Sequence, residues 1–308
     1  MSMLPPPEFV TTPLDWRNVS VLATVHLIGL SAIAWLAFAQ CSPWTIGLGV
    51  AWLLLCGFAV SGGYHRLFAH PTYRAAAVVR AAYLVFGAAA VQNSALKWAA
   101  DHRLHHAKTD RPEDPYNIHR GFWWAHMGWI FHKDVASIDV GRVKDLSMDP
   151  LLRWQDRHYV LIAILVGIVV PGLLGLLWHD PIGAVLVAGF LRLVVQWHTT
   201  FAVNSFAHRF GRRPYSLETS ARDSLWTALL TFGEGYHNFH HRFQLDYRNG
   251  PRWWHFDPTK WLVWSFARVG LARDLRRTPV EVLASARAQV ERASEETRRA
   301  TRDSAPRH

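Results

Sequence analysis

The sequence predicts an all-α membrane protein, in which four transmembrane helices carry a cytoplasmic helical cap with a histidine-rich two-metal site. Three observations lead to this fold class. Several uncharged apolar runs are long enough to cross a bilayer. Nearly all basic residues lie in segments that one side of the membrane can hold. Nine histidines are gathered in four short motifs, two of which have helical spacing.

The apolar runs predict the positions of the four spans. Half of the 308 residues are hydrophobic, yet the mean hydropathy is only +0.03, because very apolar runs alternate with charged segments. A helix needs about 20 mainly apolar residues to cross a bilayer. We expect the spans at residues 18–40, 44–62, 159–178 and 182–203. The last span contains Arg192, which should pair with polar groups or face a polar cavity, because a cation facing lipid is costly.

The positions of Lys and Arg predict how these helices cross. Residues 62–157 contain 13 of them and residues 209–308 contain 18, which with Arg17 makes 32 of the 33. The short turns at 41–43 and 179–181 contain none. Basic residues favour the cytoplasmic side, so both termini and all the histidine motifs are expected there. This asymmetry accounts for the net charge of +10, and nucleic acid is not an expected partner.

The polar segments complete the predicted organisation. Residues 1–17 form a cytoplasmic lead, and residues 63–157 and 208–274 form the cytoplasmic cap. Within the cap, residues 75–100 are expected to be one helix that lies along the membrane surface. The charged tail over residues 275–308 has an Arg and Glu spacing that indicates a solvated helix fading into disorder.

The clustered histidines predict the metal site. His102, His105 and His106 occur at i, i+3 and i+4, so a helix presents all three on one face. The same spacing recurs 135 residues later. Nine imidazoles are too many for a single mononuclear site, so we predict two metals. The nine candidate ligands are His65, His70, His102, His105, His106, His208, His237, His240 and His241.

The ligand type leaves the metal open, because neutral imidazole binds iron, zinc, copper and nickel. Asn204 lies four residues before His208 on the same helix face, and its carboxamide would reach a metal through water. Asp101 directly precedes the His102 motif, so it could orient one of the imidazoles or act as a helix cap. Glu234 forms a single Glu-x-x-His unit, which is too little for a carboxylate-bridged di-iron bundle.

The other histidines are not assigned to the metals. Ordinary interfacial or hydrogen-bonded roles are expected for His26, His158, His179, His198, His255 and His308. Support of a ligand imidazole is left open for His119, His126 and His132.

Together these motifs resemble the membrane fatty-acid desaturases, and among them the Δ9 type that includes stearoyl-CoA desaturase. The resemblance runs from about residue 50 to 273, within a desaturase domain expected over residues 18–274. Besides the histidine motifs it rests on Gln92-Asn93, Trp98, Asp101, Asp114-Pro115, Asn117, Arg120-Gly121-Phe122, Gly128-Trp129 and Gly233-Glu234-Gly235. It implies two irons on the nine histidines, with Asn204 contacting one through water. It also implies that O2 is a co-substrate and that a cis double bond forms between carbons 9 and 10 of a saturated long-chain acyl group.

The resemblance also implies contacts with the substrate. These fall on Gln92, Asn93, Trp98, Asp101 and Lys133. The animal acyl-CoA enzymes have an arginine where this chain has Ala100, and Asp134 follows Lys133 where a further basic residue is expected. We expect an acyl-CoA substrate first, with an acyl-lipid or acyl carrier protein thioester as the alternative carrier. A related di-iron fatty-acyl hydroxylase is the alternative activity.

The resemblance further implies a separate electron donor, which could be a ferredoxin, a rubredoxin, cytochrome b5 or a flavin reductase. Membrane lipid is the other expected partner. A membrane metal transporter is a distant alternative. Transporters place ionisable ligands near the bilayer midplane, whereas the predicted spans contain no Asp or Glu.

Two positions in the second span are predicted to set the length of the acyl chain. Gly57 and Leu53 lie at i and i+4, roughly 12 and 18 Å before His65 along a continuous helix. That reach is comparable to the methyl-side half of a chain of about sixteen to eighteen carbons. Gly57 has no side chain and is expected to leave room for the tail, or else to allow close helix packing.

Overall fold

The computed structural model describes residues 12–39, 41–132 and 143–303. Lys133 and Asp134, which were expected near the substrate headgroup, lie outside these residues. Within them the chain is mainly helical, with one small sheet in which β1 (Arg74–Ala75) pairs antiparallel with β2 (Ala272–Arg273). The predicted helical membrane class is confirmed.

Four of the described helices are long and apolar enough to cross a membrane, as predicted. Three of them contain π-helical segments, in which backbone N–H groups bond to carbonyls five residues earlier. The spans are α1 (Trp16–Phe38); α2 (Pro43–Phe58) with η1 (Ala59–Ala69); α7 (Pro150–Ile164) with η5 (Leu165–Val169), α8 (Val170–Gly175) and η6 (Leu176–Trp178); and α9 (Pro181–Ala184) with η7 (Val185–Leu191) and α10 (Arg192–Arg209).

The helix ends differ from the predicted span ends, because capping groups set them and hydropathy does not. The third helix begins at Pro150 and not at 159. It starts there because the Asp149 carboxylate accepts the N–H groups of Leu151 and Leu152 and so caps the helix. The second continues past residue 62 to Ala69. These added turns are polar, so the hydropathy pattern does not show them.

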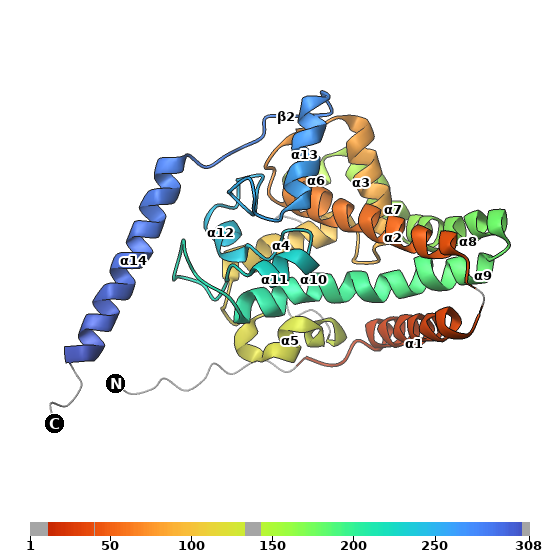
Figure 1. Ribbon diagram of the computed structural model, residues 1–308, viewed down its shortest axis with the longest axis horizontal. Helices are drawn as coiled ribbons and strands as arrows, with labels where there is room; N and C mark the ends of the chain where they lie inside the picture. The colour runs from red at the N-terminus through yellow and green to blue at the C-terminus, as the bar shows by residue number, and fades with distance from the viewer. Residues whose placement is uncertain (1–11, 40, 133–142, 304–308) are drawn as a thin grey trace.

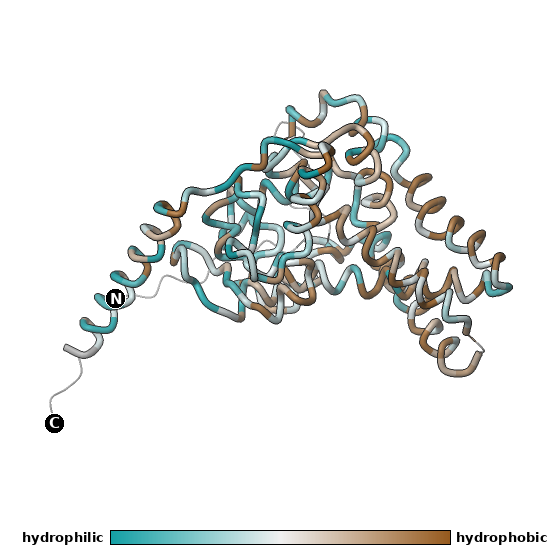
Figure 2. The backbone as a smooth tube through the Cα atoms, turned by 45° about the horizontal axis from the view of Figure 1, so that its top comes forward, coloured by the Kyte–Doolittle hydropathy of each residue, from teal (hydrophilic) through white to brown (hydrophobic). Residues whose placement is uncertain are grey.

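The bundle formed by the spans has short turns at one end and the polar cap at the other. α1 packs against η7 and α10, and α2 packs against η7. In Figure 1 the end of α1, the start of α2 and the turn between α8 and α9 lie together at the right. The cap lies at the other end, where α10 meets α5. Figure 2 shows the same division, with hydrophobic residues along the spans and hydrophilic residues around the cap.

The prediction of one helix over residues 75–100 is wrong. The segment forms α3 (Ala77–Ala89) and α4 (Ala95–Lys108), separated by Val91 and Asn93 with φ of 52° and 72°. Left-handed residues end a helix, and the Ser94 side chain then caps the start of α4. α3 packs against α7 and η1 within the bundle.

Arg192 explains how the end of α3 is held inside the bundle. Its side chain is buried and donates hydrogen bonds to the carbonyls of Ala89 (2.8 Å), Ala188 (3.0 Å) and Gly167 (3.4 Å). Ala89 is the last residue of α3, so its carbonyl has no partner within the helix. The prediction that Arg192 meets polar groups and not lipid is confirmed.

The cap is assembled from short elements around α4. The charged tail forms α14, which projects from the body in Figure 1. This agrees with the solvated helix expected there. Its first turns are not free, since Leu283 and Ala286 pack against Tyr215 and Phe239. The cap elements are η2 (Ile118–Arg120), α5 (Phe122–His126), η3 (Gly128–Phe131), α6 (Lys144–Ser147), α11 (Leu225–Leu230), α12 (His237–Arg242) and α13 (Pro258–Arg268), followed by α14 (Val280–Asp303).

Candidate metal centre

Four elements bring the nine clustered histidines together at the cap end of the spans. α4 provides three of them on one face and α12 provides three with the same spacing, as the i, i+3, i+4 pattern predicts. α10 contributes His208 in its last turn. His65 belongs to η1, and His70 directly follows it.

The π-helical backbone of η1 decides how His65 and His70 face each other. Residues five apart lie on different faces of an α-helix, but the wider π-helix brings them one above the other. The His70 N–H bonds to the His65 carbonyl at 3.1 Å, and the two ring centroids are 5.0 Å apart. This short wide turn makes both imidazoles available to one centre.

The histidines divide into two groups that could each hold a metal ion. Within each group the candidate ligand nitrogens all lie within 4.8 Å of one another. The repeated motif does not correspond to one metal, because α4 and α12 each contribute to both groups. The first group is His65, His70, His102, His106 and His240; the second is His105, His208, His237 and His241.

The nitrogens that meet within each group suit a metal and not a network of hydrogen bonds. Nε2 of His65 lies 3.0 Å from Nε2 of His240, and Nε2 of His237 lies 3.1 Å from that of His241. Burial and the neighbouring imidazoles lower the pKa of His102 and of His240 well below the usual range. A neutral imidazole that carries its proton on Nδ1 offers only a lone pair at Nε2, so converging Nε2 atoms of this kind suit a bound cation.

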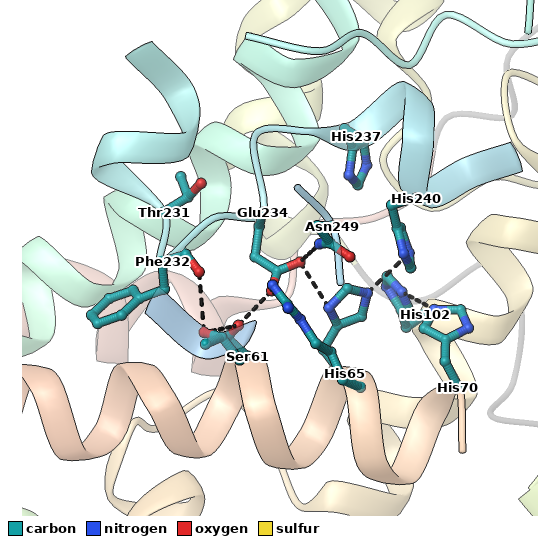
Figure 3. A network of polar contacts seen from close by, with 12 residues as sticks. Ser61, His65, His70, His102, Thr231, Phe232, Glu234, His237, His240 and Asn249 are labelled. Carbon is teal, nitrogen blue, oxygen red and sulfur yellow. Dashed lines mark hydrogen bonds and ion pairs between the residues drawn. The ribbon is translucent and has the colours of Figure 1, made fainter. Parts of the chain in front are cut away.

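A buried carboxylate orients the first group (Figure 3). Glu234 Oε2 accepts the Nδ1–H of His65 at 2.8 Å, which directs Nε2 of that ring toward the metal position. Arg66 Nη2 donates to the other carboxylate oxygen at 2.9 Å. Burial raises the pKa of Glu234, but the attraction of Arg66 and His65 outweighs it, so the net pKa is lowered. Glu234 therefore stays ionised and belongs to neither ligand group.

The loop after α4 orients the second group. Asp114 Oδ1 lies 2.8 Å from Nδ1 of His105, and Asp114 itself accepts the backbone N–H groups of Asp110 and Tyr116. The Asp110 carboxylate in turn accepts the Ser220 N–H, and Ser220 Oγ lies 2.7 Å from Nδ1 of His208. The His208 Nε2 is buried and has no hydrogen-bond partner among the described residues, as a ligand atom facing a metal position would.

An apolar cavity begins at the first group and runs between α2 and α10. Its empty space, including solvent at the mouth, is ≈ 510 Å³. His65, His102, His237 and Asn204 line it beside the metals, together with Trp98, whose ring stacks on His102 at 4.8 Å. Asn204 and Trp98 therefore line the same cavity as three of the nine histidines. The wall on the α10 side continues through Val203, Thr200, Thr199 and Gln196.

Three of the other predicted substrate residues are not among those that line this cavity. Gln92 does not line it but donates to the hydroxyl of Thr200, which does. The exposed Asn93 donates its backbone N–H to the Tyr159 hydroxyl. Asp101 lies in the middle of α4, so the suggested role as a cap at its start is wrong; Ser94 is the cap.

The two predicted chain-length residues differ in their surroundings. Gly57 lines the cavity, but the space above it is filled by the ring of Phe232. The expectation that Gly57 leaves room for the acyl tail is therefore corrected. Leu53 is half-buried one turn further along α2 and is not among the lining residues. The sequence showed no signal for Phe232, because its contact with α2 is made across the fold.

The remaining histidines of the cap lie apart from both groups. His126 Nδ1 lies 2.9 Å from Ser205 Oγ, and its Nε2 lies 3.0 Å from His198. His132 contacts the Thr12 carbonyl, and the exposed His119 lies 3.8 Å from Asp110. His126 thus contacts the residue next to Asn204, whereas His132 bonds to a backbone carbonyl near the start of the described chain.

The fold and the site define a class: a four-span helical membrane protein with a polyhistidine metal centre at one end of an apolar cavity. Within it, the chain belongs to the fatty acid desaturase family, which its residues 33–276 match.

Individual relatives agree with this assignment. The chain is 39% identical to acyl-CoA desaturase 1 of Saccharomyces cerevisiae over 285 residues, which cover 90% of this chain and 55% of the yeast protein. It is 34% identical to stearoyl-CoA desaturase 5 of Bos taurus, covering 89% of this chain and 83% of the bovine one. It is 31% identical to sn-1 stearoyl-lipid 9-desaturase of Synechocystis, covering 88% and 83%. The chain thus spans about half the length of the yeast relatives it matches.

Proposed function

We propose that the protein desaturates a saturated long-chain acyl group, carried as a CoA thioester, at Δ9 with O2 as co-substrate. The observation that carries this proposal is the position of nine imidazoles, in two groups, beside the inner end of an apolar cavity. Family membership and the names of the relatives support the reaction. In balanced form, the –CH2–CH2– unit, O2, two electrons and two protons give –CH=CH– and two waters.

The donor sets support two resident metal ions, and membership of the desaturase family favours iron for both. Five nitrogens in one group and four in the other suit two ions, with Asn204 able to complete a site through water. When bound, the irons would supply O2 activation and the oxidising power that removes hydrogen from unactivated methylenes. Glu234 and Asp114 hold His65 and His105 in the orientation that such ions require.

The remaining residues of the cavity hold the acyl chain and exclude water. Each buried methylene contributes about 0.8 kcal/mol of binding free energy, so an apolar cavity that ends at a fixed depth fixes the register of the chain. Trp98 packs against His102 and forms a wall beside the metals. The carbons to be oxidised are thereby held near the two histidine groups. The translational and rotational entropy of the acyl chain is then lost when it binds, and it does not add to the barrier of the chemical step.

The carrier and the electron source complete the proposal. Relatives named for acyl-CoA substrates match at 39% and 34% identity, and the relative named for a lipid substrate matches at 31%, which favours CoA. The predominance of Lys and Arg on the cap side supports a cytoplasmic active site. A separate ferredoxin, rubredoxin, cytochrome b5 or flavin reductase would deliver the two electrons.

The test is to express the chain in a host with a simple saturated fatty-acid profile and to analyse the products by gas chromatography with assignment of the double bond. A new Δ9 cis-monoene that requires O2 is expected. A hydroxylated product would instead support the hydroxylase alternative, and no new product would contradict the proposal. Purified enzyme supplied with acyl-CoA, acyl carrier protein or lipid then decides the carrier, and metal analysis should give two irons per chain.

A further inference from the structure

Phe232 has an unusual backbone conformation for its residue type. Its φ is 56°, in the left-handed region, and it is followed by Gly233 with φ of 94°. A bulky side chain in this region is strained, and such strain persists only where the surroundings hold it. Glycine would adopt the same conformation freely, so the backbone conformation by itself does not account for a phenylalanine at this position.

The ring of Phe232 rests on the bare backbone of Gly57. A methyl group added at Gly57 would lie 2.8 Å from Cε1 of the ring and would overlap Cζ. The adjoining Phe58 ring meets Phe232 edge-on, with centroids 5.2 Å apart. Gly57 therefore provides a seat for the ring, and the two residues form one contact between α2 and the turn that precedes α12.

This contact lies at the end of the cavity furthest along α2 from the metals. Both residues line the cavity, and Gly57 is separated from His65 by about two helical turns, roughly 12 Å at the α-helical rise. In Figure 3 the Phe232 ring lies beyond Ser61 as seen from His65. An acyl chain that passes the first histidine group would meet this ring with its methyl end.

A buried hydrogen-bond chain links this end of the cavity to a metal ligand. The Thr259 hydroxyl lies 3.1 Å from the Phe232 carbonyl and 2.8 Å from the Ser61 hydroxyl. Ser61 donates to Glu234, whose other oxygen lies 2.8 Å from Nδ1 of His65. These side chains are buried, so the network sets the spacing between the ring and the metal ligand.

We propose that Phe232 is the floor of the acyl cavity and that it determines the chain length the enzyme accepts, with Gly57 as its seat and the Thr259–Ser61–Glu234 network as its spacer. This inference rests on the proposed desaturase activity, since it concerns the acyl chain that activity oxidises. It assigns the role expected of Gly57 and Leu53 to a residue of the cap.

Phe232→Gly tests the floor without a backbone penalty, because glycine adopts the observed φ. Parent and variant enzymes would receive an equimolar mixture of saturated acyl-CoAs of graded length, and the monoene products would be quantified. We expect the product ratio to shift toward longer chains, by about tenfold for each two carbons newly accommodated. The double bond should remain at the parent position, since it is counted from the headgroup.

Phe201→Ala is the matched control. Phe201 is a buried phenylalanine of α10 that packs with Trp197 and Leu193 and is not part of the cavity wall. Its truncation should lower the amount of folded protein without changing the product ratio. An unchanged ratio in Phe232→Gly would overturn the inference while leaving the desaturase proposal intact, whereas inactivity of the parent on every chain would sink the proposed function itself.

A double substitution tests the seat. Gly57→Ala alone should lower activity at least about tenfold, because the new methyl group displaces the ring. In the Phe232→Gly background the same substitution should cost less than about twofold, because nothing is left to displace. Equal losses in both backgrounds would show that the two residues do not act through their contact.

Thr259→Val tests the spacer. Valine keeps the shape of threonine but removes the hydroxyl that contacts the Phe232 carbonyl. The discrimination between neighbouring chain lengths should fall several-fold, with no new preferred length, because the floor stays present but loses its fixed position. A product ratio identical to that of the parent would remove the network from the proposal.

Discussion

The two histidine groups use the same device but stabilise it differently. In each, a buried carboxylate holds Nδ1 of one ligand at 2.8 Å: Glu234 on His65 and Asp114 on His105. Glu234 is balanced by the cation of Arg66. Asp114 is balanced by backbone N–H groups of its own loop. The first group therefore depends on an ion pair between Glu234 and a cation 168 residues away in the sequence, which lies next to the ligand His65, and the second depends on a local fold of the chain.

The two carboxylates should therefore differ in how strongly their loss affects the folding of the protein. Arg66 also contacts Asp257 at 3.0 Å and the Tyr247 carbonyl, so the support of the first group is continuous with the packing of the cap. The loop at Asp110–Tyr116 supports two ligands of the second group, and the bonds that hold Asp114 come from the loop itself. Loss of the first anchor should affect folding and chemistry together, whereas loss of the second should affect chemistry as much and folding less.

The largest expected effect is the loss of a ligand from either group. His240→Ala in the first group and His105→Ala in the second should each reduce desaturation more than about 100-fold, beyond the 10–100-fold typical of residues that orient a ligand. Product formation per membrane-inserted protein is the measurement. His179→Asn, in the far turn at φ of 59°, is the control and should remain active. Full activity of His105→Ala would make the second group dispensable.

The carboxylates should differ most in stability. Glu234→Gln leaves the buried Arg66 with fewer ionised partners, which should cost about 1–3 kcal/mol of unfolding free energy and about 10–100-fold in iron affinity. Asp114→Asn should lower iron affinity as much but stability less, because the amide oxygen can still accept one of the Asp110 and Tyr116 N–H groups and no buried cation loses its partner. Thermal unfolding in detergent and iron titration measure the two effects. Equal loss of stability would refute the proposed contrast.

The smallest effect is expected at the hydroxyl that supports His208. Ser220→Ala removes the hydrogen-bond partner of the His208 Nδ1. This should lower the free energy of unfolding by about 1 kcal/mol and the activity by up to about tenfold. Ser220→Thr keeps a hydroxyl and should behave like the parent. Activity and iron content of both variants decide the point, and a loss as large as that of His105→Ala would mean that Ser220 does more than orient one ring.

The spans show how far local pattern carries a prediction. Their number and order follow from apolar runs, because burial in lipid requires a long stretch of one residue class. Their ends do not follow, since Asp149 and Pro150 start a helix among charged residues. The break between α3 and α4 was missed for a similar reason: Val91 adopts a left-handed backbone angle that its β-branched residue type disfavours.

The sequence alone determined which residues carry the chemistry: nine clustered histidines, apolar runs and a one-sided distribution of Lys and Arg. These are local properties, readable within a few residues of one another. Only the tertiary structure decided the partners, because contacts such as His65 with His240, 175 residues apart, depend on the packing of whole helices. The π-helical turn that aligns His65 with His70, the division of each motif between two groups and the ring of Phe232 on Gly57 all arise at that level.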